Sequence, residues 1–78
     1  MKETLLYNDN EIAVYVYLDE YTIINKNTAE ISTRILDWWV NDDETYLQFL
    51  ELILKEINAH YTQETLETIS NAYRKEFM

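Results

Sequence analysis

The chain has 78 residues, no cysteine, and fifteen acidic against six basic residues, for a formal net charge of −9. A chain of this length forms one domain, residues 1–78, and it has neither disulfides nor a thiolate metal site to stabilise it. Because phosphates and anionic membrane surfaces would repel it, we expect direct contact with neither nucleic acid nor membrane, and a basic protein partner instead.

Glycine and proline are both absent from the sequence. Their absence excludes glycine-rich phosphate loops, dinucleotide-binding fingerprints and EF-hand loops. Turns must be built from Asn, Asp, Ser or Thr, and we expect positions with positive φ to be Asn or Asp.

The first third of the chain favours strands. Residues 3–7 and 11–18 are rich in β-branched and aromatic residues, with a turn signal at 8–10 between them. In the second strand Ile12, Val14, Val16 and Leu18 alternate with Ala13, Tyr15 and Tyr17. A helix over 11–18 would be apolar nearly all round, so we prefer the strand. A turn at Asp19-Glu20 would lead to a third strand at 21–24, which the poor turn chemistry leaves open.

Helical spacing dominates the rest of the chain. A first helix over about 28–40 would carry a stripe of Ile31, Ile35, Trp38 and Trp39. The second, about 42–60, has the broadest apolar arc in the sequence, with Asn41 or Asp42 as its cap. The third covers about 63–77. We therefore predict an α+β fold, in which a two- or three-stranded antiparallel sheet (about 3–25) precedes three helices packed on one sheet face.

Little in the sequence points to catalysis. His60 is the single histidine, and with no second histidine we interpret it as a packing residue near a helix end. The run Asp42-Asp43-Glu44 could hold a hard cation, but a helix cap is the simpler interpretation. We expect no enzymatic activity, no cofactor and no metal.

The candidate binding residues are carboxylates and aromatic side chains. Five acids from Asp37 to Glu51 have no basic residue among them, and the turns before and after the second strand add four more. Tyr15 and Tyr17 would project from the sheet face opposite the core, which no remaining segment covers. Of the two adjacent tryptophans, we expect one to anchor the core and the other to lie at its margin or in an interface. The predicted partner-binding residues are Asp9, Glu11, Asp19, Glu20, Asp37, Asp42, Asp43, Glu44, Glu51, Tyr15, Tyr17 and Trp39.

In size, acidity and lack of catalytic residues the chain resembles the small phage-encoded inhibitors of host defence, of the anti-CRISPR and anti-restriction type, some of which mimic nucleic acid. The resemblance covers the whole chain and includes no motif, so it carries over no site residues. It implies a non-enzymatic inhibitor of a basic nucleic-acid-handling protein, such as a nuclease complex.

Two alternatives stay open. One is a bacterial immunity protein or antitoxin that neutralises a toxin nuclease, and the other is a structural subunit that forms a homodimer through its Tyr face. The sequence has no signal-peptide-like segment and no apolar run of transmembrane length, so we expect a cytoplasmic protein, in the host cytoplasm if it is phage-encoded.

Overall fold

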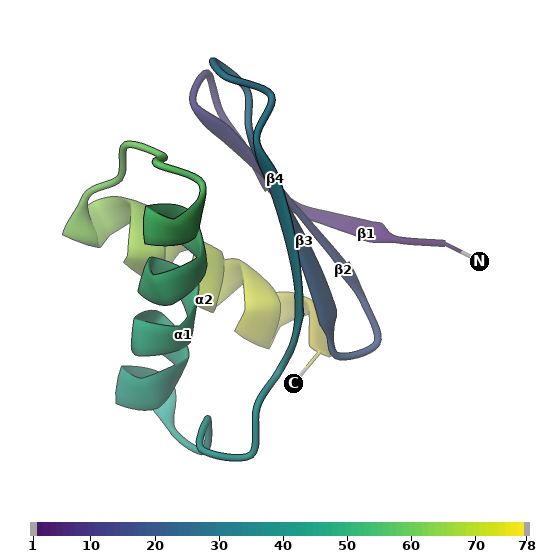
Figure 1. Cartoon of the computed structure of the whole chain (residues 1–78). Helices are drawn as coiled ribbons and strands as arrows, with labels where there is room; N and C mark the ends of the chain where they lie inside the picture. The colour runs from purple at the N-terminus through teal and green to yellow at the C-terminus, as the bar shows by residue number, and fades with distance from the viewer. Residues whose placement is uncertain (1, 78) are drawn as a thin grey trace.

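A computed structural model describes residues 2–77 as four strands followed by two helices. Neighbouring strands pair antiparallel in chain order, β1-β2-β3-β4, and both helices lie on the same side of the sheet (Figure 1). The predicted α+β class is confirmed, but the predicted two or three strands with three helices are wrong. The elements are β1 (Thr4–Asn8), β2 (Ile12–Tyr17), β3 (Glu20–Asn25), β4 (Ile31–Ile35), α1 (Asp43–Glu56) and α2 (Gln63–Phe77).

The segment predicted as the first helix, 28–40, is instead a turn, the strand β4 and a loop. The i, i+4 spacing of Ile31 and Ile35 also fits a strand, because Ile31, Thr33 and Ile35 alternate with Ser32 and Arg34. β-branched residues favour the extended form, and β3 offers an edge along which β4 pairs in continuous register. Pairing with the sheet therefore overrides the helical spacing.

The third strand, left open by the sequence, is present as β3. Its turn is formed by Leu18 and Asp19 rather than by the predicted Asp19-Glu20. The predicted turn would have paired Val16 with Ile23, whereas Val16 pairs with Tyr21. Leu18 adopts φ 56° at the first turn position. The other described residues with positive φ are Ala29 and Asn58, so only one of the three is of the expected type.

The core lies between the helices and the inner face of the sheet. Val14, Val16 and Ile23 project from the central strands toward the apolar arc of α1, and all are buried. Tyr21 joins them, with its ring edge-on to Phe49 at a centroid distance of 5.4 Å. Burial raises the pKa of the Tyr21 hydroxyl well above its ordinary value, and that hydroxyl lies 2.5 Å from the hydroxyl of Tyr46 on α1.

Helix α1 ends at Glu56 rather than at about 60. Asn58, in the left-handed region, places its N–H on the carbonyl of Lys55, and Ala59 donates to Leu54, which closes the helix end. The buried side chain of Asn25 holds this end against the sheet, because its amide donates to the carbonyls of Ile57 and Asn58 at 3.0 and 3.3 Å. The bounds of α2 agree with the predicted 63–77.

Candidate protein-binding surface

The face of the sheet opposite the helices is not covered by any segment within residues 2–77 (Figure 1). We call it the outer face. Cross-strand pairing places Tyr15 beside Thr22, Thr22 beside Thr33, and Ile24 beside Ile31, so each row runs across neighbouring strands. The outer face comprises Leu5, Asn8, Ala13, Tyr15, Tyr17, Glu20, Thr22, Ile24, Ile31, Thr33 and Ile35.

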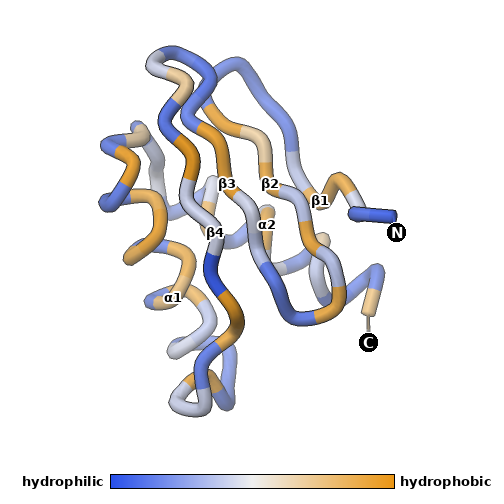
Figure 2. The backbone as a smooth tube through the Cα atoms, turned by 45° about the vertical axis from the view of Figure 1, so that its right-hand side comes forward, coloured by the Kyte–Doolittle hydropathy of each residue, from blue (hydrophilic) through white to orange (hydrophobic). Residues whose placement is uncertain are grey.

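Apolar side chains dominate the outer face. Ile31 and Ile35 are 60% and 59% exposed, and Tyr15, Tyr17 and Ile24 are half-buried. Figure 2 shows hydrophobic positions along the sheet strands as well as along α1, which supplies the core. An apolar sheet face in water is typical of an interaction site rather than of a solvated surface. The alternation along β2 identifies Tyr15 and Tyr17 from the sequence, whereas the helical spacing of residues 28–40 conceals Ile31, Thr33 and Ile35 of β4.

The two tryptophans have separate environments. Trp39, the predicted binding residue, packs edge-on to Phe49 at 6.3 Å and donates from Nε1 to Asp37 at 3.2 Å. Trp38 is 92% exposed. Of the two tryptophans, Trp38 therefore has the indole that a partner could contact. Because the two are adjacent in the sequence, the sequence alone does not show which one is exposed.

Except for Glu51, which lies on α1, the predicted acidic residues fall into two groups at opposite ends of the sheet. Asp9 and Glu11 lie in the β1–β2 turn. The β2–β3 turn lies at the other end of the sheet, next to the loop that leads into α1, because Leu36 donates to the Asp19 carbonyl at 2.9 Å. We call this the β2–β3 end, and its carboxylates are Asp19, Glu20, Asp37, Asp42, Asp43 and Glu44.

Several of the predicted partner-binding carboxylates, including two outside the β2–β3 end, have local structural partners. Asp9 accepts from the hydroxyl of Tyr7 at 2.6 Å and from two backbone N–H groups of its turn. Burial raises the pKa of Asp9, but these hydrogen bonds lower it more, so the net shift is downward. The hydrogen bond between Tyr7 and Asp9 also raises the pKa of the Tyr7 hydroxyl to about 12. Glu51 accepts from Tyr61 at 2.9 Å on the side of α1.

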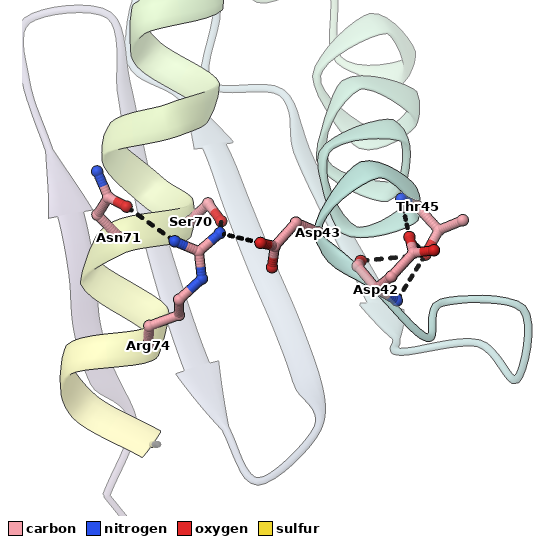
Figure 3. A network of polar contacts seen from close by, with 6 residues as sticks. All are labelled: Asp42, Asp43, Thr45, Ser70, Asn71 and Arg74. Atoms are coloured by element: carbon pink, nitrogen blue, oxygen red, sulfur yellow. Dashed lines mark hydrogen bonds and ion pairs between the residues drawn. The ribbon is translucent and has the colours of Figure 1, made fainter.

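Asp42 is the N-cap of α1. Its carboxylate accepts from the Thr45 N–H at 2.9 Å, which lowers the pKa of Asp42 (Figure 3). Asp43 pairs with Arg74 of α2 at 2.9 Å, and Arg74 also donates to Ser70 and Asn71. The residues at the β2–β3 end with no such role among the described contacts are Asp19, Glu20 and Glu44.

A pocket of about 240 Å³ lies where α1, α2 and the loop before α1 meet. Tyr46 and Tyr73 line its apolar part, and Asp43 and Arg74 at its rim neutralise each other. His60, which we expected near the end of a longer helix, is exposed in the loop after α1. Within residues 2–77, no three His, Asp or Glu side chains are grouped so as to hold a metal ion.

Neither helix of the described chain is long and apolar enough to cross a membrane. Comparison with protein-family models, curated proteins and solved structures finds no match to this chain. The functional interpretation therefore rests on the outer face, the β2–β3 end and the exposed Trp38.

Proposed function

We propose that this protein is a non-enzymatic inhibitor that acts in the cytoplasm by binding a basic, nucleic-acid-handling protein. The outer face would make the contact, and the carboxylates of the β2–β3 end would guide the partner to it. The observation that carries this proposal is the open outer face itself. On this face the four-stranded sheet presents Tyr and Ile side chains to solvent, although the chain has enough polar residues to occupy those positions.

The composition of the outer face suits protein recognition. Tyrosines such as Tyr15 and Tyr17 bring a large apolar ring with few rotatable bonds, so they bind at a low entropic cost and are enriched in interface hot spots. The flanking threonines Thr22 and Thr33, whose hydroxyls lie 3.4 Å apart, give the same face polar groups that can pair with a partner.

The charge around this face favours a basic partner. Glu20 lies on the outer face between Tyr17 and Ile35, and Asp19 lies in the adjoining turn. Exposed carboxylates with no nearby cation raise the rate at which a positively charged protein arrives, and salt weakens that effect. Because the acids divide between two ends of the sheet, we propose steering at one end rather than mimicry of a whole nucleic-acid strand.

An immunity protein or antitoxin would use the same surface on a toxin nuclease, and the identity of the captured partner distinguishes the two. The structural-subunit alternative predicts instead that the outer face is occupied by a second copy. In that case the substitutions below would change the oligomeric state and no basic partner would be retained.

The test combines capture from a cognate lysate with binding kinetics on the captured protein. Asp19→Lys/Glu20→Lys should slow association about tenfold at low salt, whereas Tyr15→Ala/Tyr17→Ala should mainly speed dissociation. Glu64→Lys/Glu67→Lys on α2 is the matched control, because it changes the net charge equally but away from the outer face. Asp42 and Asp43 are unsuitable because their substitution would disturb α1.

A captured protein that binds the Tyr15→Ala/Tyr17→Ala variant as tightly as the unmodified chain would contradict the assignment of the outer face. Association that does not change with ionic strength, or that responds equally to the control variant, would contradict electrostatic steering by the β2–β3 end. Capture of proteins with no basic, nucleic-acid-binding surface would contradict the proposed class of partner.

A further inference from the structure

The strand β4 forms an edge of the sheet whose backbone groups are unpaired within the described chain. In antiparallel pairs, alternate residues bond to the neighbouring strand. Asn25 donates to the Glu30 carbonyl at 2.8 Å and Leu36 donates to the Asp19 carbonyl at 2.9 Å, so the even-numbered residues of this segment face β3. The N–H and C=O groups of Ile31, Thr33 and Ile35 therefore point outward from the sheet.

This edge has few of the features that normally block strand addition, and its one charged side chain, Arg34, is paired with Glu56. The edge has no proline, bulge or lysine, and its pairing with β3 runs without a register shift. The opposite edge, β1, is interrupted by an irregularity between Leu5 and Tyr7. An open, regular edge of β-branched residues is a template for another strand.

We infer that two copies of this chain pair through β4, antiparallel about a two-fold axis at Thr33, to form one eight-stranded sheet. The sequence of β4, Ile-Ser-Thr-Arg-Ile, is nearly self-complementary in that arrangement. Thr33 meets Thr33 of the second copy, and Ile31 meets Ile35, so the outward-pointing backbone groups of both strands pair with one another.

Side chains on both faces fit this register. On the outer face, the rows that contain Tyr15, Thr22 and Thr33 continue into the same rows of the second copy. On the inner face, Arg34 of one copy lies opposite Ser32 of the other. Ser32 donates to the carboxylate of Glu56, and Arg34 lies 3.2 Å from the same carboxylate, so each Glu56 would gain a second arginine across the interface.

Helix α1 adds an apolar contact beside the same edge. Leu52 is 41% exposed and precedes Glu56 by one helical turn, so it lies on the side of α1 that faces β4. The strand itself carries no acid, and the neighbouring Glu56 is already paired with Arg34. The strand therefore adds no negative charge of its own to the interface between two acidic chains. This inference is independent of the proposed partner, because it requires only the purified protein.

Because the chain contains no cysteine, a single introduced cysteine can form a disulfide only with the same residue of a second copy. In the β4-paired dimer, two Thr33→Cys residues have Cα atoms about 5.5 Å apart, within disulfide range, and should cross-link under mild oxidation. Thr22→Cys is the matched control, because it lies in the same row but three strand spacings from its copy, about 14 Å, which is too far to bridge. Both variants should fold, since both side chains lie on the outer face.

Sedimentation of the unmodified protein should show a concentration-dependent rise from 9.5 kDa toward twice that mass. Thr33→Pro removes only an outward-pointing N–H, so it should keep the fold by circular dichroism and raise the dimer dissociation constant at least about tenfold. A monomer at millimolar concentration, equal cross-linking of the two cysteine variants, or a dimer that Thr33→Pro leaves unchanged would overturn the inference.

Discussion

Replacing Asn25 by aspartate tests whether one buried amide holds the sheet against the end of α1. Asn25 is almost fully buried, and its Oδ1 accepts from the N–H groups of Asn27 and Thr28 at 3.0 and 3.3 Å. Its Nδ2 donates to the carbonyls of Ile57 and Asn58. An ionised aspartate keeps the two accepted hydrogen bonds but faces both carbonyls with no proton to donate.

The expected cost follows from these contacts. Two lost hydrogen bonds and a buried charge facing carbonyl oxygens should lower the free energy of unfolding by about 3–5 kcal/mol at pH 7. A domain of this size has only about 4–12 kcal/mol in total, so Asn25→Asp should be close to unfolding. Asn25→Ala loses all four contacts without adding a charge, and should cost about 3 kcal/mol.

Acid should partly rescue Asn25→Asp and leave Asn25→Ala unaffected. The fold favours the neutral acid, which can donate to Ile57, so the pKa of the introduced aspartate is raised above its unfolded value of about 3.9. The folded state then binds more protons, and the penalty relative to the unmodified protein grows as pH rises through the folded pKa.

Urea unfolding of all three proteins at pH 4 and pH 7, followed by circular dichroism, measures this difference directly. A penalty for Asn25→Asp that is the same at both pH values would refute the assigned direction of the amide. A loss below about 1 kcal/mol for both variants would show that the Asn25 contacts do not hold the helix end.

Three further outcomes follow from other contacts. Leu18→Gly should stabilise the protein by about 0.5–1 kcal/mol in urea unfolding, because Leu18 is 74% exposed and has φ 56°; a loss of stability would contradict this. Tyr21→Phe and Tyr46→Phe should each cost about 1–2 kcal/mol, and the double variant less than their sum; additive losses would contradict the shared hydroxyl contact. The pKa of Tyr7 is raised from 10.0 in the unfolded chain to about 12 in the folded protein, so the folded protein keeps the hydroxyl proton to a higher pH. The contribution of Tyr7 to the free energy of unfolding is therefore full below pH 10 and is lost as the pH rises toward 12. Tyr7→Phe should reduce that loss, and an unchanged alkaline profile would contradict the hydrogen bond to Asp9.

The sequence predicted those elements whose apolar residues follow a single regular spacing, either that of a strand or that of a helix. The alternation from Ile12 to Val16 predicted β2, and the apolar arc around Phe49 and Ile53 predicted α1, because each segment buries one face against the other. The sequence offers Asn41 or Asp42 as the cap of this helix, and Asp42 caps α1. These assignments needed no knowledge of distant residues.

Tertiary pairing decided what the sequence left ambiguous. Ile31 and Ile35 fit a helix or a strand equally, and only the edge of β3 selects the strand. Asn58 ends α1 through a backbone conformation that an amphipathic pattern does not report. For the candidate site, Tyr15 and Tyr17 were placed on the outer face correctly. The division of the acids between two ends depends on how the strands are connected, which composition does not reveal.

The contact between α2 and β1 joins the two ends of the described chain. During synthesis the four strands leave the ribosome before either helix, and their inner face stays without α2 until Gln63–Phe77 has followed. A nascent sheet of this kind has two apolar faces and an open edge, which is a hazard for aggregation. We expect ribosome-bound chains that stop after α1 to remain protease-sensitive and to recruit chaperones.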